Sequence, residues 1–186
     1  MLYARNCSIK ELDSNTASDF CNKYHLQGYA NASVNLGLCY NNKLIGLMTF
    51  GNPRFDTEYQ YELIRLCWKS GYSIVGGAEK LFKYFISKYN PDDIVSYCDI
   101  SKFTGNIYTK LGFTLESKKL TYPDHVWIKG KKILNNEQTK MSELTKYKLN
   151  AFGDTEDDIM HNIGFYKVYN CGNLKFVYNK QEGNKL

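Results

Sequence analysis

Long apolar runs are missing from this sequence. No apolar stretch approaches the roughly 18 residues that a membrane-spanning helix needs, and the opening segment, MLYARNCSIKELD, contains no apolar region of the kind found in a signal peptide. Internal repeats and low-complexity tracts are missing as well. We therefore expect a soluble protein that works in the cytoplasm.

Paired metal ligands are also missing. The six cysteines contain no CxxC and no paired spacing, and half of them lie inside apolar, strand-like runs where a free cysteine behaves as a small core residue. His25, His125 and His161 show no metal-ligand spacing either. These patterns predict neither a disulfide framework nor a metal site, and they fit a reducing compartment.

Positive charge is concentrated in one segment. The formal net charge is +5, and residues 129–150 hold six lysines and two glutamates, a local charge of +4. The rest of the chain therefore sums to only +1. Such a segment is either a solvated linker or an electrostatic contact for nucleic acid, and the composition leaves both interpretations open.

The apolar pattern up to about residue 128 alternates strands and helices. Asn41-Asn42-Lys43 predicts a tight hairpin turn, and the helix between the runs at 61–68 and 94–100 makes these two strands parallel. The order predicts an α/β, or α+β, fold with a mixed central sheet and helices on both faces. Strands are expected at residues 2–9, 33–40, 44–50, 61–68, 94–100, 113–120 and 124–128, and helices at 14–24, 78–89 and 104–111.

The composition changes after residue 129. A polar, Lys-rich and helical stretch runs to about residue 149, and residues 154–158 read as the acidic start of a helix. The runs FYKVY and LKFVY flank Asn170-Cys171-Gly172-Asn173 and predict a terminal β-hairpin. We place the boundary at residue 130, with residues 1–130 as the main domain and 131–186 as a C-terminal extension.

A glycine pair precedes the helix expected at 78–89. It leaves backbone N–H groups uncovered where the helix begins, and the positive end of the helix dipole favours a phosphate group there. An ordinary turn is the alternative, but a second short helix carrying Tyr108 after the next parallel strand favours the phosphate interpretation. The candidate cofactor-binding residues of this loop are Ser73, Ile74, Val75, Gly76, Gly77 and Ala78.

Both segments resemble motifs of the GNAT acyltransferases. The family's pyrophosphate loop reads Gln/Arg-x-x-Gly-x-Gly/Ala, which Gly76 and Ala78 match while Ser73 replaces Gln or Arg. YTKLGF is similar to the family's Tyr-x-x-x-Gly-Phe segment. The resemblance covers about residues 1–128. It implies acetyl-CoA or another acyl-CoA as cofactor, with Tyr108 protonating the departing thiolate; alternatively, Tyr108 only packs its helix onto the sheet.

A narrower resemblance is to phage Mom-type DNA-modification proteins, which are GNAT-like. Their Glu-Leu-x-Arg-Leu strand and their Ala-Asp-x-x-x-x-x-x-Gly-x-x-Tyr segment match Glu62, Arg65, Asp99, Gly105 and Tyr108, with a cysteine in place of the alanine. The tail IGFYKVYNCGNLKFVY resembles segments of phage proteins described as Hef-like homing endonucleases, without their nuclease portion. These resemblances imply a nucleic-acid substrate and, for a phage-encoded protein, the host cytoplasm.

The residues themselves support part of this implication. Asp99 ends a parallel strand, where ligands collect in α/β sheets, and it could take a proton from an amine or form a turn. Glu62 is a second candidate base. Arg65 interrupts an apolar strand, so its partner is Glu62 or a bound phosphate, unless it is a plain edge-strand arginine. Glu62 and Arg65 lie on opposite faces unless a β-bulge intervenes.

The function that fits best is transfer of an acyl group from acyl-CoA to an amine, preferably an exocyclic base amine in DNA. Tyr108, Asp99 and Glu62 would be catalytic, while Arg65 and the loop at 73–78 would bind the cofactor. Residues 129–150 and the terminal hairpin would hold nucleic acid, and a homodimer is one option for the oligomeric state. Two alternatives stay open: a GNAT-shaped nucleic-acid-binding module without catalysis, and a small-molecule or protein N-acetyltransferase.

Overall fold

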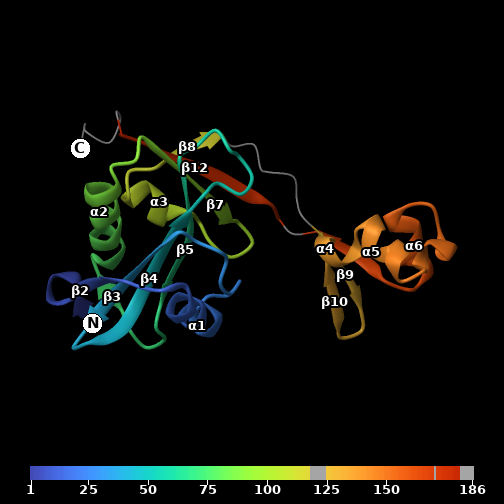
Figure 1. The fold of residues 1–186 in the computed structure, drawn as a ribbon, viewed down its shortest axis with the longest axis horizontal. Coiled ribbons are helices and arrows are strands. Elements are labelled where there is room, and N and C mark those ends of the chain that lie inside the picture. The colour runs from blue at the N-terminus through green and yellow to red at the C-terminus, as the bar shows by residue number, and fades with distance from the viewer. Residues whose placement is uncertain (118–124, 170, 181–186) are drawn as a thin grey trace. The chain divides into compact units, whose positions relative to one another are not determined.

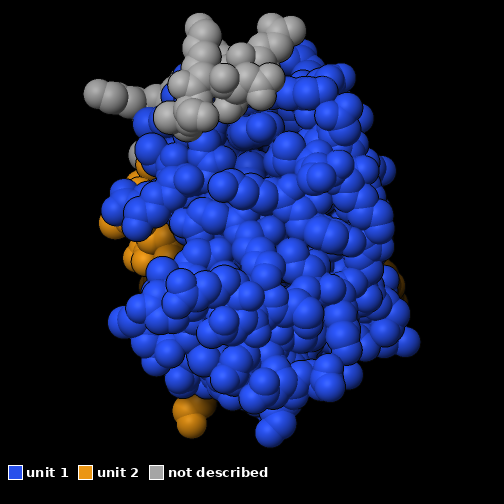
Figure 2. All heavy atoms as spheres, turned by 90° about the vertical axis from the view of Figure 1, so that its left-hand side faces the viewer, with its two compact units in different colours: residues 1–98, 105–118, 175–186 blue, residues 99–104, 119–174 orange. Residues whose placement is uncertain are grey.

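The structure is a computed structural model that describes residues 1–117, 125–169 and 171–180. Its contacts divide the chain into two compact units, which Figure 1 traces and Figure 2 colours separately. Unit 1 comprises Met1–Cys98, Gly105–Lys118 and Lys175–Leu186. Unit 2 comprises Asp99–Thr104 and Lys119–Leu174. This division differs from the single boundary predicted at residue 130.

Unit 1 is built on a seven-stranded mixed sheet with the order β2-β3-β4-β5-β7-β12-β8. The strands β2 to β5 pair antiparallel in succession, whereas β5 and β7 are parallel, as predicted. Asn41 and Asn42 adopt positive φ in the predicted turn between β3 and β4. The strands are β2 (Ser8–Glu11), β3 (Val34–Tyr40), β4 (Lys43–Gly51), β5 (Tyr61–Trp68), β7 (Asp93–Asp99), β8 (Thr114–Ser117) and β12 (Asn173–Asn179).

Helices cover both faces of this sheet, as the sequence predicted. On one face Phe20 joins a buried cluster with Leu47 of β4, and on the other Phe85 stacks on Phe50 of β4 with 3.5 Å between the ring centroids. Leu47 and Phe50 are three positions apart in a strand and therefore point to opposite faces. Within the described part of the chain, no helix is long and apolar enough to cross a membrane. The helices of unit 1 are α1 (Ser14–Tyr24), α2 (Gly77–Tyr89) and α3 (Asn106–Lys110).

The N-terminal residues form a strap, residues 2–6, beside the loop that precedes α2. The single strand predicted over residues 2–9 is interrupted, because η1 (Ala4–Asn6) separates β1 (Leu2–Tyr3) from β2. β1 pairs in parallel with β6 (Ile74–Val75), and the Leu2 N–H donates a hydrogen bond to the Ser73 carbonyl at 2.8 Å. The strap therefore lies directly against the predicted phosphate loop.

Unit 2 is a small module with its own core. Its three-stranded antiparallel sheet has the order β10-β9-β11. The apolar side chains of this core are Trp127, Leu144, Ile159, Met160 and Phe165. The elements are β9 (His125–Lys129), β10 (Lys132–Asn135), α4 (Asn136–Thr139), α5 (Met141–Lys146), η2 (Leu149–Phe152), α6 (Glu156–Asn162) and β11 (Tyr166–Tyr169).

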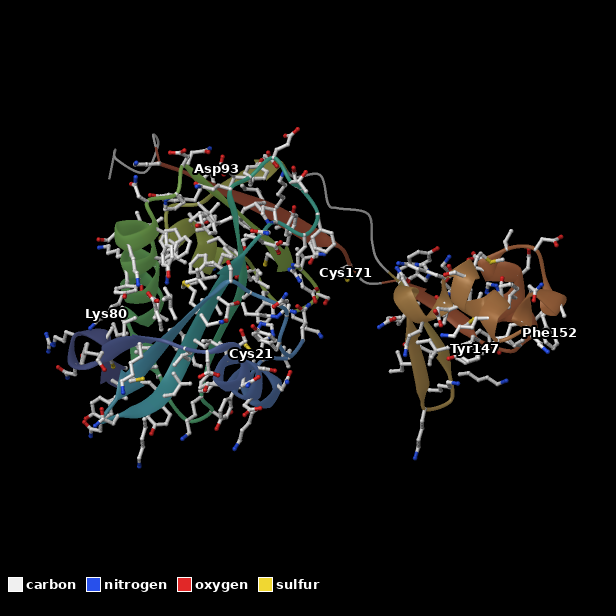
Figure 3. The ribbon with its side chains drawn as sticks, in the orientation of Figure 1. Cys21, Lys80, Asp93, Tyr147, Phe152 and Cys171 are labelled. Atoms are coloured by element: carbon white, nitrogen blue, oxygen red, sulfur yellow. The ribbon has the colours of Figure 1, made fainter. Side chains whose placement is uncertain are left out.

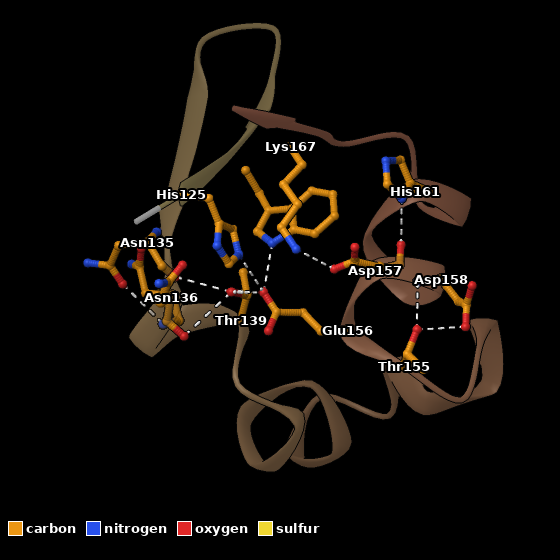
Figure 4. Close-up of polar contacts among 12 residues, drawn as sticks. His125, Asn135, Asn136, Thr139, Thr155, Glu156, Asp157, Asp158, His161 and Lys167 are labelled. Atoms are coloured by element: carbon orange, nitrogen blue, oxygen red, sulfur yellow. Dashed lines mark hydrogen bonds and ion pairs between the residues drawn. The ribbon is translucent and has the colours of Figure 1, made fainter. Parts of the chain in front are cut away.

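A polar network centred on Glu156 ties the sheet of unit 2 to its helices (Figure 4). Glu156 Oε1 accepts hydrogen bonds from Trp127 Nε1 at 2.7 Å and from the Thr139 hydroxyl at 2.8 Å, and His125 Nε2 lies 3.3 Å away. Burial raises the pKa of Glu156, but these hydrogen bonds outweigh it and leave the pKa lowered. The acidic helix start predicted at 154–158 is therefore present and anchors the core of unit 2.

The terminal β-hairpin predicted from FYKVY and LKFVY does not form, because its two strands join different sheets. β11 pairs with β9, whereas β12 pairs with β8 in the central sheet. Most of unit 2 is therefore inserted in the chain between β8 and β12. An alternating apolar pattern identifies a strand but does not specify its pairing partner. Of the strands predicted at 113–120 and 124–128, residues 118–120 and 124 lie outside the described residues.

Candidate active site

β5 and β7 lie side by side for only a short distance. Their parallel pairing ends at Glu62, which lies opposite Val95. One step further, the Ser96 hydroxyl donates a hydrogen bond to the Leu63 carbonyl at 2.8 Å. β5 then runs on to Trp68 with no strand paired to that side among the described residues. Its backbone groups on this edge are therefore available to an extended ligand.

A β-bulge reorients the polar side chains of β5. The register with β4 shifts between Leu63 and Arg65, so Ile64 is an extra residue in β5. Because of this bulge, Glu62 and Arg65 point to the same face of the sheet. It is the face covered by α1, since Cys67 packs into the α1 cluster two positions beyond Arg65. The sequence analysis predicted opposite faces for Glu62 and Arg65 unless a β-bulge intervenes, and the structure contains that bulge.

Glu62 is buried and held by Arg54. Its side chain is 1% exposed; Oε2 accepts from the Arg54 backbone N–H at 2.8 Å, and Oε1 accepts from Nη2 at 2.5 Å and from Nε at 3.1 Å. Arg54 lies in the loop between β4 and β5 with its side chain 36% exposed. A buried carboxylate needs such a partner. In this arrangement both oxygens of the Glu62 carboxylate already accept hydrogen bonds from Arg54. The predicted catalytic role of Glu62 stays a prediction.

Sequence reasoning assigned no role to Arg54, because it directly follows the breakers Gly51, Asn52 and Pro53. The available signal was a glutamate inside an apolar strand, which requires a cation close by. Arg54 also lines a hollow of about 440 Å³ together with Ser33 and Asn52. The residue that pairs with Glu62 thus also borders an open hollow.

Arg65 does not pair with Glu62. Its Nε donates to the Gly28 carbonyl at 2.8 Å and its Nη1 to the Ile64 carbonyl at 3.0 Å, so it ties the loop after α1 to β5. Burial, assisted by the Arg65 cation, lowers the pKa of His25 to about 4, so His25 is neutral at physiological pH. The Nη2 group of Arg65 has no hydrogen-bond partner among the described residues. Its predicted role in cofactor binding stays a prediction.

Tyr108 lies on α3 and contacts the neighbouring strands β7 and β12. Its hydroxyl donates to the Tyr97 carbonyl of β7 at 3.3 Å, and its ring stacks on Phe176 of β12 with 4.8 Å between centroids. Gly105 begins α3 with a φ of 78°, and a Cβ there would come within 2.6 Å of Phe176. Burial raises the pKa of Tyr108. The phenol is therefore protonated at neutral pH and able to donate its proton.

Asp99 forms a turn at the end of β7. Its Oδ1 accepts hydrogen bonds from the Ser101 backbone N–H at 2.9 Å and from the Ser101 hydroxyl at 2.5 Å. The Phe103 N–H donates to the Asp99 carbonyl at 3.0 Å. These contacts agree with the alternative that Asp99 forms a turn. Asp99 does not cap α3, because the residue that caps this helix is Gly105. A catalytic role for Asp99 stays a prediction.

Gly76 and Gly77, the cap and the first residue of α2, are glycines for different structural reasons. Gly76 caps the helix with a φ of 75°, which side chains rarely adopt, and no side chain caps the first turn. Gly77 allows close approach, because a Cβ there would come within 2.8 Å of the Trp68 ring. The first-turn N–H groups of α2 therefore lack a side-chain cap and suit an anion.

Lys175 holds the loop between β4 and β5 in place. Its Nζ lies 2.5 Å from Asp56 Oδ2 and 2.6 Å from Glu116 Oε2, and the Tyr59 hydroxyl donates to Glu116 at 2.5 Å. Burial lowers the pKa of Lys175, but these hydrogen bonds outweigh it and raise the pKa overall. The hydrogen bond from Lys175 lowers the pKa of Asp56 in turn. We call these contacts of Lys175 with Asp56 and Glu116 the Lys175 clamp. The clamp holds the loop that contains Arg54 beside the sheet.

Replacing Lys175 by methionine is expected to reduce acid sensitivity. Because the pKa of Asp56 is lower in the folded than in the unfolded chain, the clamp stabilises the fold at neutral pH and its contribution is lost as the pH falls. We expect Lys175→Met to lower the free energy of unfolding by about 1 kcal/mol at pH 7, with a smaller difference below about pH 4. Urea unfolding across this pH range measures it; an unchanged pH dependence would contradict the clamp.

Several solved acetyltransferases share this fold. The ribosomal-protein-S18-alanine N-acetyltransferase of Escherichia coli matches with a TM-score of 0.53 at 12% identity, covering 93% of each chain. A GNAT family acetyltransferase from Elizabethkingia anophelis with acetyl-CoA bound matches with a TM-score of 0.51 at 14% identity, covering 94% of this chain and 98% of that one. A spermidine/spermine N-acetyltransferase from Vibrio cholerae has a TM-score of 0.50 at 14% identity, covering 64% of this chain and 84% of that one. No protein-family model matches the sequence, and no curated protein does.

At these identities the likeness concerns the fold alone. The mixed seven-stranded sheet, the parallel pair β5 and β7, and the helices on both faces agree with the fold class predicted from the sequence. Among the described residues, no group of three His, Cys, Asp or Glu side chains is placed to hold a metal ion. The chain therefore has the GNAT acetyltransferase fold.

Proposed function

We propose that this chain is an N-acyltransferase that moves an acyl group from acyl-CoA to an amine. The observation that carries the proposal is the edge of β5 beyond Glu62, to which no strand of the described residues is paired. The edge begins next to the bulge at Ile64 and leads to the glycine loop at 73–78. Tyr108 reaches the neighbouring strand β7 with a protonated hydroxyl.

The shape of CoA suits this arrangement. Its pantetheine arm is an extended chain with two amide groups, so it can add to a strand edge as a peptide does. Its pyrophosphate would then meet the backbone N–H groups of the loop at 73–78. The Elizabethkingia anophelis acetyltransferase of the same fold has acetyl-CoA bound. Ser73, where the family motif has Gln or Arg, leaves the loop to bind the pyrophosphate through its backbone.

The chain's side chains supply the proton transfers. The amine nitrogen attacks the thioester carbonyl; a C–N bond forms and the C–S bond breaks. Tyr108 gives its hydroxyl proton to the departing thiolate. The amine proton passes to Glu62, once Arg54 has released it, or to Asp99. Arg54 thereby becomes a positioning residue for one of the two candidate bases.

The preferred acceptor is an exocyclic base amine in nucleic acid. The resemblance of Glu62, Arg65, Asp99, Gly105 and Tyr108 to the Mom-type pattern supports this acceptor. A base inside a duplex is not accessible, so the acceptor is single-stranded or flipped out of the helix.

Unit 2 offers a surface for the nucleic-acid backbone and bases. Tyr166 is 73% exposed, Ile133 61% and Val168 44%, and the strand register places all three on the sheet face opposite Trp127. Lys131 is exposed in the turn between β9 and β10. Tyr147 and Phe152, labelled in Figure 3, are also exposed, at 65% and 49%. Exposed aromatic rings with lysines suit single-stranded nucleic acid.

Two other functions have an observation in their favour. Ser73 in the cofactor loop favours a nucleic-acid-binding module that has lost catalysis. The charge of only +1 outside residues 129–150 favours a small-molecule or protein N-acetyltransferase. Acetyl-CoA binding separates the first of these from the proposal, and the choice of acceptor separates the second.

The donor site is tested by isothermal titration with acetyl-CoA. Val75 is 47% exposed in the loop, so its replacement leaves the core untouched. We expect Val75→Glu to weaken binding about tenfold, because a carboxylate then lies beside the pyrophosphate. The matched variant Val75→Gln, of the same size without charge, should bind like the wild type. Absence of binding to the wild type would overturn the acyl-CoA mechanism, and equal affinities of the two variants would move the pyrophosphate away from this loop.

A further inference from the structure

An exposed aromatic ring, that of Phe55, lies in the loop between β4 and β5. Phe55 is 75% exposed. Its ring meets the ring of Tyr97 on β7 edge to face, with 5.3 Å between the centroids and 82° between the planes. The guanidinium carbon of Arg54 lies 5.4 Å from the centroid of the Phe55 ring. Phe55 thus touches the sheet through Tyr97, while most of its surface is open to solvent.

The residues on either side of Phe55 are both anchored. Arg54 is paired with the buried Glu62, and Asp56 is paired with Lys175 in the Lys175 clamp. A single exposed apolar side chain is ordinary on a protein surface. Phe55 differs because its two neighbours in the chain are fixed, so that its ring is held at a defined place. Such a side chain loses less freedom when a ligand covers it.

Phe55 lies close to the groups proposed for proton transfer. Glu62 is opposite Val95 in the sheet, and the side chain of Tyr97, two positions further along β7, is therefore on the same face as Glu62. The carbonyl of Tyr97 accepts the hydrogen bond from the Tyr108 hydroxyl at 3.3 Å. A flat group that rests on Phe55 would therefore lie near the place where the acyl group is transferred.

We propose that Phe55 and Tyr97 form a stacking platform for the acceptor base, and that Phe55 is the residue through which this chain recognises a flat acceptor. The inference rests on the proposed function, because it assumes that acyl transfer takes place at the edge of β5. It assigns the reacting base to unit 1, whereas the exposed rings of unit 2 would hold other parts of the strand.

The chemistry of the platform suits a nucleobase. Every base has a flat π face, and stacking on an aromatic side chain is a main source of affinity for single strands. The guanidinium of Arg54 adds a second flat surface, on which bases also stack, and a positive charge that attracts the neighbouring phosphate. An aliphatic amine has no flat face and cannot use this platform in the same way.

The test measures binding of fluorescein-labelled trideoxyadenylate by fluorescence anisotropy, with CoA present so that no acyl transfer takes place. We expect Phe55→Ala to bind about tenfold more weakly than the wild type, because the base loses its stacking surface. Phe55→Tyr keeps an aromatic ring and should bind within about twofold of the wild type. Thr57→Ala, exposed in the same loop, is the matched control and should bind like the wild type.

A second ligand isolates the contribution of the bases. A labelled abasic trinucleotide has the phosphates without the bases, so the wild type and Phe55→Ala should bind it equally weakly. Because Phe55 is mostly exposed, Phe55→Ala should fold normally, which circular dichroism checks.

The outcomes separate this inference from the proposed function. If Phe55→Ala binds trideoxyadenylate as tightly as the wild type, the platform is overturned, while the acyl-CoA donor stands on its own titration with acetyl-CoA. Equal weakening by Phe55→Ala and Phe55→Tyr would also overturn it, because it would indicate a disturbed loop instead of lost stacking. If the wild type does not bind trideoxyadenylate, the platform and the preferred acceptor fall together. A loss that Phe55→Tyr restores, and that is confined to the ligand with bases, supports the platform.

Discussion

Replacing Tyr108 by phenylalanine is expected to lower kcat at least about 100-fold while leaving KM for acetyl-CoA within about twofold. The variant loses only the hydroxyl, and its ring can still stack on Phe176. Without the hydroxyl the thiolate leaves without a positioned proton donor. The assay follows acetyl transfer from acetyl-CoA to a mixed-sequence single-stranded oligodeoxynucleotide by mass spectrometry of the released nucleosides.

The control for this result is Tyr84→Phe. Tyr84 lies on α2, and its hydroxyl donates to Glu11 of β2 at 3.3 Å. This contact is away from β7, so loss of the hydroxyl should leave turnover unchanged. Equal turnover by Tyr108→Phe and the wild type would exclude Tyr108 as the proton donor. If the wild type binds acetyl-CoA but transfers nothing to DNA, amines of proteins and polyamines become the next acceptors to assay.

Trp127→Ala is expected to lower the free energy of unfolding of unit 2 by about 3–5 kcal/mol. Trp127 is fully buried in the core of unit 2, and its indole N–H donates to Glu156 at 2.7 Å. The substitution therefore removes the largest buried side chain of this core and one of the hydrogen bonds that hold Glu156. Hydrogen-exchange mass spectrometry measures the effect in the segments of β9 and α6.

A graded series makes this second prediction specific. Trp127→Phe keeps much of the volume but not the N–H donor, so it should cost less than Trp127→Ala. Tyr166→Ala removes an exposed aromatic side chain from the same unit and should change stability by no more than about 0.5 kcal/mol. Unchanged protection of β9 and α6 in Trp127→Ala would show that the core of unit 2 does not depend on this indole.

The parts of the fold that could be predicted from the sequence are those determined by adjacent residues. The turn at Asn41-Asn42, the amphipathic helices α1 and α2, and the glycine cap at Gly76 each depend on a short continuous segment. Periodicity and turn chemistry describe such segments well. The fold class followed from their order along the chain.

The parts that could not be predicted depend on distant partners. The sequence LKFVY was recognised as a strand. Its pairing partner is β8, which precedes most of unit 2 in the sequence, and no local pattern indicates this. The bulge at Ile64 leaves no mark in the residues of β5, although it decides that Glu62 and Arg65 share a face. The pairing of Glu62 with Arg54 depends on how the loop between β4 and β5 returns to the strand.

The position of β12 also has a consequence for the order of events during synthesis. A ribosome that has completed β8 must still make about 55 residues, roughly 3–10 s of translation, before it supplies the strand that lies between β7 and β8. During that interval β7 and β8 each lack the neighbour that separates them in the finished sheet, and Tyr108 lacks Phe176. The nascent protein therefore acquires its complete candidate active site only after unit 2 has been translated.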